Sequence, residues 1–442
     1  MKRIIDKCQK RLIEKGIKEY EIYLIIQKNT TIDVKRGKVE LFKVAESRGI
    51  SLRLLKDKKI GFAYTTSLDE YALEKLIDRA KESLEGVSID PYSVFPGPNT
   101  YPNLEIYDNA LDKIPIKEKI EFAKEMEASA LSYDSRIKRV RASQFQEKNI
   151  RVFIKNHKGL DAYYKKTILI GNILVVAEEK NEAEMGWEFE AQIYFNKLNP
   201  RNIGMQAGKW AIEALGGRSI PTQKVPLILI NRVVIQFLEV LCQSFFADKV
   251  QKGKSLLAPY LGKMVMSPSV TIIDDGIIKG GIGSRPFDDE GVPQQRTILI
   301  EDGILKDFLY DSYTANKAGK QSTGNCVREK IELPPRVHIT NLYLKKGNTS
   351  FFHLLKALNK GLVVTDVLGM HTVDPISGDF SVGACGYWVE GGERRFSVKG
   401  IAISGNVLNI FKGVTLVGSD FLFLGNIGAP SMLIEETQIS GS

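Results

Sequence analysis

The chain has 442 residues, of which 43% are hydrophobic and 26% are charged, with 38 glycines and 16 prolines. These values are typical of globular proteins, and they exclude a disordered chain, a collagen-like repeat and a small disulfide-stabilised scaffold. The formal net charge is +9, but the basic residues are spread along the chain, whereas a nucleic-acid-binding protein concentrates them on one face. We therefore expect no nucleic-acid partner.

The cysteines and the apolar runs bear on the compartment. Cys8, Cys242, Cys326 and Cys385 lie far apart and form no Cys-x-x-Cys motif, which favours a reducing cytoplasm. The N-terminus is charged throughout, unlike a signal peptide. The longest apolar run, residues 168–177, is much shorter than the ~20 residues needed to span a bilayer. We expect a soluble, cytoplasmic protein with no membrane partner.

The pattern divides the chain into four parts: an N-terminal α/β segment (1–88), a proline-rich linker (89–104), a middle α/β segment (105–218) and a β-rich C-terminal domain (221–442). The linker carries four prolines within residues 90–102, which neither a helix interior nor a central strand tolerates. The sequence thus predicts an α+β protein, with a mixed α/β N-terminal region followed by a β-rich C-terminal domain that has a sandwich or barrel-like layer.

In the first segment, apolar residues at helical spacing predict a helix over 4–13. Alternating residues around Arg36-Gly37-Lys38 predict a β-hairpin, and further strands are expected at 20–26, 49–55 and 59–64. Ser67 and Glu70 have the spacing of a capping box, so a helix should follow to Glu82. Its inward-facing residues are expected to be Tyr71, Leu73, Leu76, Ile77 and Ala80.

The middle segment is predicted to have helices at 117–131 and 202–215, with strands between them at 138–144, 149–155, 161–178 and 184–194. The C-terminal domain opens with a strand at 226–230 and a run of helical spacing at 233–248. Short strands then alternate with glycine-rich turns, at 270–273, 296–300, 305–310, 361–364, 387–389, 401–403 and 421–423.

The usual catalytic patterns are missing. The four histidines are too far apart to give two zinc ligands on one helix, and the chain has no GxSxG elbow, P-loop or dinucleotide fingerprint. His371 and Cys385 are each able to bind a metal, but a site normally needs three or four protein ligands. The thiols are better interpreted as small core residues.

One stretch, residues 283–293, carries three consecutive carboxylates between turn residues: Asp288, Asp289 and Glu290. A functional interpretation is a binding site for a cation or for a peptide amine. The alternative is a charged connector in which an aspartate caps a turn. Composition alone favours the connector.

Two further stretches, 322–328 and 368–384, are small, polar and rich in turns, as pocket linings often are. From them we select Asn325, His371 and Ser381 as candidate substrate-binding residues, together with the three carboxylates. None of these stretches specifies a reaction.

At these residues the chain resembles the PmbA/TldD family, also called modulators of DNA gyrase, and it is closer to the TldE (PmbA) branch. The resemblance covers nearly the whole chain and is carried by 90–92, 133–137, 283–293, 309–319, 322–328, 340–344, 368–386 and 425–431. It implies an α/β N-terminal part, a β-rich C-terminal part and dimers around an enclosed cavity. It also implies a metalloprotease that cuts unfolded peptides. The TldD branch carries an HExxxH helix with two zinc ligands and a glutamate general base, and a downstream cysteine completes the site. The TldE branch lacks these ligands and pairs with TldD.

Residues 248–255 resemble the stretch that follows the metal helix in the family. Counting back, the resemblance puts the histidine positions on Leu238 and Gln243 and the general-base position on Glu239. Leucine cannot bind zinc and a glutamine carbonyl is a poor substitute for imidazole, so we expect no metal in this chain and zinc in a TldD-type partner. Without a metal-bound water, Glu239 has no group of lowered pKa to deprotonate. Cys385 is interpreted as a packing residue.

Two hypotheses of different class follow, with a weaker third. In the first, the chain is the non-catalytic subunit of a heterodimeric metalloprotease, which completes the chamber and holds an unfolded peptide along an exposed strand edge. In the second, it is a self-sufficient metal-dependent peptidase built on the three carboxylates with His371 or Cys385, a set that suits Mg²⁺ or Mn²⁺. In the third, it is a non-enzymatic homodimeric peptide-binding protein. The absent HExxxH motif favours the first.

Overall fold

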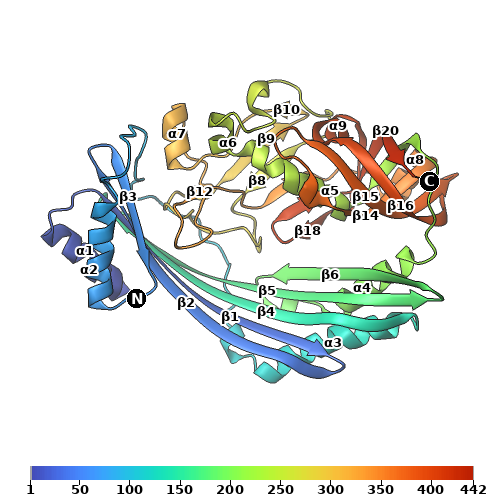
Figure 1. Cartoon of the computed structure of the whole chain (residues 1–442), viewed down its shortest axis with the longest axis horizontal. Helices are drawn as coiled ribbons and strands as arrows, with labels where there is room; N and C mark the ends of the chain where they lie inside the picture. The colour runs from blue at the N-terminus through green and yellow to red at the C-terminus, as the bar shows by residue number, and fades with distance from the viewer. Residues whose placement is uncertain (1, 442) are drawn as a thin grey trace.

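A six-stranded antiparallel sheet runs through the N-terminal half of the chain, in the order β3-β2-β1-β4-β5-β6. The computed structural model describes residues 2–441. The strands of this sheet are β1 (Tyr20–Lys35), β2 (Lys38–Lys56), β3 (Lys59–Thr65), β4 (Ile137–Asn156), β5 (Asp161–Glu179) and β6 (Glu182–Gln192). Figure 1 shows it as a long, curved layer beneath the C-terminal domain.

The pairing of β1 with β4 joins the first and middle segments into this one sheet. The two strands are paired from Glu21 opposite Asn156 to Asp33 opposite Gln144. The proline-rich residues 89–104, all of them described, have neither helix nor strand. The linker therefore connects two parts of a single layer.

Four helices cover one face of the sheet: α1 (Lys2–Glu14), α2 (Glu70–Glu82), α3 (Ile116–Tyr133) and α4 (Pro200–Ala214). Successive residues of a strand point to opposite faces. Accordingly Leu24 packs in the core under α1 and α2, Ile32 packs in the core under α3 and α4, and Tyr23 points the other way, toward the C-terminal domain, where it contacts Asp289. This alternation fixes which face carries the helices and which faces the rest of the chain.

The C-terminal domain contains a closed five-stranded barrel. Its strands are β7 (Gln223–Leu229), β14 (Lys360–Leu368), β15 (Asp379–Glu390), β16 (Glu393–Asn406) and β20 (Met432–Ser440), in the order β16-β15-β14-β7-β20. The pairing of β16 with β20, which includes Ala402 opposite Ser440, closes the ring. β17 (Val414–Val417) adds to the other side of β20. The predicted α+β class with a barrel-like C-terminal layer is confirmed, with 25% helix and 41% strand overall.

A second sheet lies beside the barrel, in the order β10-β9-β8-β13-β19-β18. Its strands are β8 (Ile272–Asp275), β9 (Arg296–Glu301), β10 (Ile304–Leu305), β13 (Leu342–Leu344), β18 (Leu422–Leu424) and β19 (Ile427–Ala429); a separate pair is β11 (Cys326–Val327) and β12 (Arg336–Val337). The helices of this half are α5 (Asn231–Leu241), α6 (Ala247–Gln251), α7 (Ser312–Ala318), α8 (Phe351–Leu358) and α9 (Val407–Lys412). The 3₁₀ turns of the chain are η1 (Leu111–Lys113), η2 (Phe195–Lys197), η3 (Cys242–Phe245), η4 (Ala258–Tyr260) and η5 (Met370–Thr372).

Helix α5 lies between the barrel and the second sheet. It contacts β7 and β14 on one side and β18 and β19 on the other. Seven of its eleven residues are buried, and Phe237, for example, packs edge-on against Phe380 of the barrel with ring centroids 5.1 Å apart. This helix therefore has a rigid position in the middle of the C-terminal core.

Three local predictions are corrected by the structure. β4 is one continuous strand rather than two, because residues 145–148 stay paired with β1 and β5. The N-cap of α2 is Asp69 rather than Ser67, since the Asp69 carboxylate accepts the N–H of Ala72 at 2.8 Å. Tyr71 is 74% exposed, so it does not face inward.

The run of helical spacing at 233–248 is also interrupted. Phe246 has an extended backbone, with φ −78° and ψ 121°, and so separates η3 from α6. No helix within residues 2–441 is both long enough and apolar enough to cross a membrane.

Candidate functional site

The end of helix α5 and the following η3 turn border a small cavity of about 410 Å³. Glu239 and Gln243 are four residues apart, both exposed, and both line it. Leu238 points elsewhere and is fully buried in the domain core. The other walls come from Cys242, Phe246, Asp248, Lys249, Arg336, Val337, His338, Ile339, Asn426 and Ile427.

The cavity's thiol and imidazole are held in their neutral forms. The Cys242 thiol donates to the main-chain oxygen of Glu239 at 2.9 Å; burial, reinforced by the carboxylates of Glu239 and Asp274, raises its pKa to about 12. His338 stacks at a tilt on Phe246, with ring centroids 5.6 Å apart, and burial lowers its pKa. Neither group is poised as a thiolate nucleophile or a cationic acid near neutral pH.

The donor set of this cavity does not fit a catalytic zinc. Leu238 offers no lone pair, and the amide of Gln243 is a weak ligand compared with imidazole. Within residues 2–441, the group of three His, Cys, Asp or Glu side chains whose ligand atoms lie within 4.8 Å of one another is Asp288, Glu290 and Cys326. That group lies outside this cavity.

Asp288, Asp289 and Glu290 come together, but in the interior between the N-terminal sheet and the C-terminal domain. All three are buried, at 3% exposure or less. Asp288 accepts the backbone N–H groups of Glu290 and Val292 on one oxygen and that of Cys326 on the other. These hydrogen bonds hold the turn of this loop.

The neighbouring carboxylates pair with arginines and with the sheet. Asp289 accepts from the Tyr23 hydroxyl at 3.1 Å and from Arg285 at 2.9 Å. Glu290 pairs with Arg53 of β2 at 2.9 Å, and Arg53 also pairs with Glu21 of β1 at 2.6 Å. This network connects the loop at 283–293 to the sheet.

Burial and mutual repulsion set the charges in this network. Burial, followed by the nearby charge of Glu290, raises the pKa of Asp288 to about 8. Burial also opposes ionisation of Glu290, but Arg53 and the N–H of Ser312 outweigh it and lower its pKa. Glu290 therefore carries the negative charge of the pair. The oxygens of Glu290 are engaged by Arg53 and the N–H of Ser312, and those of Asp288 by three backbone N–H groups. The group of Asp288, Glu290 and Cys326 therefore has few lone pairs left for a metal.

Asn325 does not line the small cavity, but it contacts His338, which does. Its amide nitrogen donates to Asp274 at 2.7 Å and to the main-chain oxygen of His338 at 3.0 Å. His371, on η5, and Ser381, on β15, are exposed. Of the residues that the structure describes, those lining the small cavity include neither His371 nor Ser381. The structure thus brings the three carboxylates together, and all six sequence-predicted residues lie outside the lining of the small cavity.

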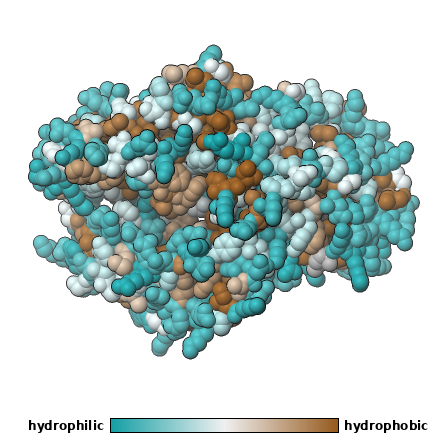
Figure 2. Space-filling model, turned by 180° about the vertical axis from the view of Figure 1, so that it is seen from behind, coloured by the Kyte–Doolittle hydropathy of each residue, from teal (hydrophilic) through white to brown (hydrophobic). Residues whose placement is uncertain are grey.

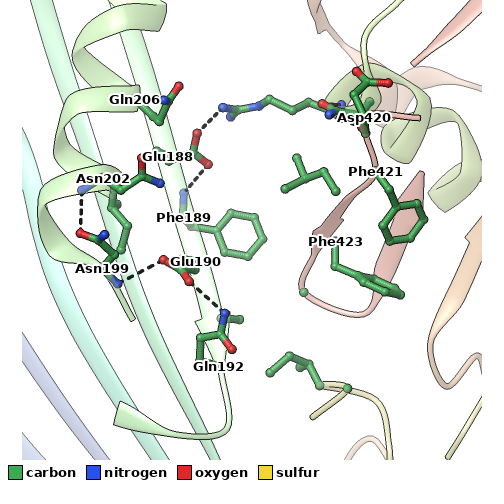
Figure 3. Close-up of a pocket in the computed structure, with 18 of the residues that line it drawn as sticks. Glu188, Phe189, Glu190, Gln192, Asn199, Asn202, Gln206, Asp420, Phe421 and Phe423 are labelled. Atoms are coloured by element: carbon green, nitrogen blue, oxygen red, sulfur yellow. Dashed lines mark hydrogen bonds and ion pairs between the residues drawn. The ribbon is translucent and has the colours of Figure 1, made fainter. Parts of the chain in front are cut away.

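A larger cavity, of about 820 Å³, opens between the two halves of the chain. One wall is β6 with helix α4, and the other is the start of α5 with β18 and the loop before it (Figure 3). The wall formed by β6 and α4 is rich in amides, namely Gln192, Asn199, Asn202 and Gln206, and Phe189 points from it into the cavity, whereas Phe421 and Phe423 lie on the opposite wall. Figure 2 shows apolar side chains gathered in the middle of the molecule, where its halves meet.

Arg232, at the start of α5, connects the two walls of this cavity. Its guanidinium pairs with Glu188 of β6 at 2.7 Å and lies over the rings of Trp187 and Trp210, at 4.3 and 5.0 Å from their centroids. On the same wall, Glu190 accepts from Gln192 at 2.9 Å and from the backbone N–H of Asn199 at 3.3 Å. The contacts of Arg232 fix β6 against the start of α5.

Two strand edges border the larger cavity. β6 is the last strand of the N-terminal sheet and β18 is the last strand of the second sheet. Both contribute to the cavity lining, and α5 runs from the larger cavity, at Asn231, to the smaller one, at Glu239. The two cavities are therefore arranged along one helix. Sequence reasoning missed the larger cavity, because β6 and β18, which border it, are more than 200 residues apart in the chain.

Three family models match the chain: PmbA/TldA metallopeptidase domain 1 at residues 20–84, the central domain at 109–215 and the C-terminal domain at 222–441. The chain belongs to the PmbA/TldD family. The metalloprotease PmbA of Escherichia coli O157:H7 is 29% identical over 94% of this chain and 91% of its own length. A PmbA homologue of Buchnera aphidicola subsp. Acyrthosiphon pisum is 31% identical over 72% of this chain and 69% of its own length. These relatives support the PmbA (TldE) branch.

Solved PmbA/TldD-type structures share the fold over the whole length. A protein described as a modulator of a DNA gyrase, from Thermotoga maritima, superposes with a TM-score of 0.92 at 31% identity, covering 99% of this chain and 100% of the other. TldE from Thermococcus kodakarensis superposes with a TM-score of 0.89 at 23% identity, covering 98% and 100%. The architecture described above is thus the PmbA/TldD architecture.

Proposed function

We propose that this chain is the PmbA/TldE-type subunit of a two-chain metalloprotease, in which a TldD-type partner carries the zinc. Its role is to hold an unfolded peptide and to complete the chamber, and it binds no metal itself. The observation that carries the proposal is the combination along α5 and the η3 turn that follows it: a cavity with two strand edges at one end, and Leu238 and Gln243, with no zinc-binding set, at the other.

The larger cavity suits an extended peptide of varied sequence. A strand edge such as β18 or β6 recognises backbone N–H and C=O groups, which every peptide carries. The amides of Asn199, Asn202 and Gln206 supply further donors and acceptors, and Phe421 offers an apolar surface for side chains. Such a site selects the unfolded state of a substrate rather than one sequence.

The carboxylate-based alternative gains no support from the geometry. Asp288, Asp289 and Glu290 are buried and already held by arginines and N–H donors. A substrate would have to break this network to reach them, which is costly for buried charges.

We also assign the chain to the cytoplasm. Its four thiols are free and three of them are buried, as expected for a protein kept in a reducing compartment.

The test is a reconstitution with purified chains. We expect this chain alone to contain no stoichiometric metal and to leave an unfolded peptide intact, and a mixture with a TldD-type chain to cleave it. Phe423→Ala, which truncates a 37% exposed cavity residue, should raise the KM of the mixture. Phe352→Ala, which truncates a 59% exposed ring on α8 outside the cavity, is the matched control and should not.

Stoichiometric metal together with cleavage by this chain alone would contradict the proposal. Equal KM values for the two phenylalanine variants would leave a partner role but remove the cavity as the place where peptide is held.

A further inference from the structure

Two pairs, each an aromatic residue followed by a glutamate, come one after the other on β6: Trp187-Glu188 and Phe189-Glu190. Residues two apart on a strand point to the same face. Accordingly, the rings of Trp187 and Phe189 are stacked, with centroids 6.1 Å apart and an angle of 10° between their planes. The second pair therefore repeats the arrangement of the first, one step farther along the edge of the sheet.

The first pair already binds an arginine of the chain. The Arg232 guanidinium pairs with the Glu188 carboxylate at 2.7 Å and lies 4.3 Å from the centroid of the Trp187 ring. It also donates a hydrogen bond to the main-chain oxygen of Trp187 at 3.0 Å. A carboxylate, an aromatic ring and a carbonyl oxygen of the strand edge together hold this guanidinium.

The second pair has the same three features and holds no cation. Phe189 and Glu190 line the larger cavity (Figure 3), and the Glu190 carboxylate is fixed by Gln192 and by the N–H of Asn199. Alternate residues of an edge strand direct their carbonyl groups to the same side, so the Phe189 oxygen faces outward as the Trp187 oxygen does. Within residues 2–441, no basic side chain pairs with Glu190 or lies over the Phe189 ring.

The charges of the cavity lining also favour a basic ligand. Its charged residues are Glu188, Glu190, Asp420, Arg232 and Lys279. Arg232 is paired with Glu188, and Lys279 pairs at 3.6 Å with Glu105, which lies outside this lining. Both oxygens of Asp420 accept hydrogen bonds from Ser431. The cavity is therefore left with an excess of negative charge, and Glu190 is the carboxylate that a cation can pair with.

We propose that Phe189 and Glu190 bind an arginine side chain of the peptide in the larger cavity, so that the chain prefers unfolded peptides that contain arginine. Arginine suits the site better than lysine, because its planar guanidinium stacks on an aromatic ring while its N–H groups reach a carboxylate and a carbonyl oxygen. The inference rests on the proposed function, and it adds one side-chain preference to the recognition of the peptide backbone.

The experiment measures by fluorescence anisotropy how the full chain alone binds two labelled peptides. One probe is a short, unstructured peptide of glycine, serine and leucine with a single central arginine. In the other probe, citrulline, which has nearly the same shape but no charge, replaces the arginine. We expect the wild type to bind the arginine peptide at least about tenfold more tightly, because its guanidinium makes charge-assisted hydrogen bonds.

Two variants and a control locate this preference. Glu190→Gln keeps an oxygen for the N–H of Asn199, and it should remove the preference while leaving the Kd of the citrulline peptide unchanged. Phe189→Leu should weaken binding of the arginine peptide by about threefold, through loss of the cation–π contact. Glu435→Gln, which neutralises an exposed carboxylate on β20 outside the cavity, is the matched control and should keep the wild-type preference. Circular dichroism and the thermal midpoint check that each variant is folded.

Equal binding of the two peptides by the wild type, whether tight or undetectable, would overturn the proposal, and so would a preference that survives Glu190→Gln. No TldD-type chain or metal is present in this experiment. Equal binding together with cleavage by the reconstituted mixture would therefore reject the arginine site and leave the proposed function. An arginine preference without cleavage would do the reverse.

Discussion

Replacing Arg232 with methionine should loosen the joint between the two halves of the chain. The substitution removes the ion pair with Glu188 and the contacts with Trp187 and Trp210. Removing one partner of a buried pair costs about 3–5 kcal/mol. The lower end applies, because Glu188 keeps the indole N–H of Trp210 at 3.1 Å. The two lost cation–π contacts add roughly 0.5–1 kcal/mol each. We therefore expect a loss of about 4 kcal/mol in the free energy of unfolding.

Urea unfolding followed by tryptophan fluorescence measures this change, since two of the three tryptophans flank Arg232. The matched control is Arg394→Met: Arg394 also lies over an aromatic ring, that of Tyr387 at 4.7 Å, and pairs with Glu213 at 3.6 Å, but its side chain is 39% exposed. It should cost less than about 1 kcal/mol. Adding Glu188→Met to Arg232→Met should recover part of the loss. A loss for Arg232→Met as small as that of the control would refute the reasoning.

Three further predictions concern other parts of the molecule. Burial, with the charge of Arg285, lowers the pKa of Lys166 to about 7 in the folded chain. Between pH 7 and about 10 the unfolded chain therefore binds more protons than the folded chain does. Because of this difference, Lys166 makes the free energy of unfolding rise with pH over that window. Lys166→Met should flatten that part of the profile of thermal midpoint against pH. Gly386→Ala places a Cβ 1.9 Å from a carbonyl oxygen of the neighbouring barrel strand and should lower the thermal midpoint strongly, whereas Gly383→Ala, with its nearest neighbour at 3.5 Å, should not. Glu239→Gln should leave the peptidase activity of the reconstituted mixture unchanged, and a loss of about 100-fold would instead identify a general base.

Local elements were predictable where their cause is local. The hairpin at Arg36-Gly37 forms where predicted, because both residues adopt positive φ, 53° and 69°, in a two-residue turn of the kind that closes hairpins. Where two local causes compete, the sequence did not decide between them. Ser67 and Asp69 are both N-cap residues by type, and only the structure shows that Asp69 caps α2.

The candidate site was less predictable, because burial is not a local property. Three consecutive carboxylates suggest a surface site or connector, but Tyr23 and Arg53, more than 200 residues earlier, contact them: Tyr23 donates a hydrogen bond to Asp289, and Arg53 forms an ion pair with Glu290. The larger cavity likewise joins β6 with Phe421 and Phe423. No spacing rule relates such distant residues.

By itself, the amino-acid sequence determined the α+β class, most helices and strands, and the motifs that place the chain in the PmbA/TldD family. These follow from periodicity, turn chemistry and short motifs, which act over a few residues. The tertiary structure decided that the first and middle segments form one sheet, that the barrel closes through β16 and β20, and that two strand edges meet at one cavity. These features depend on which distant strands pair and on what each side chain is buried against, and that is settled only when the whole chain packs.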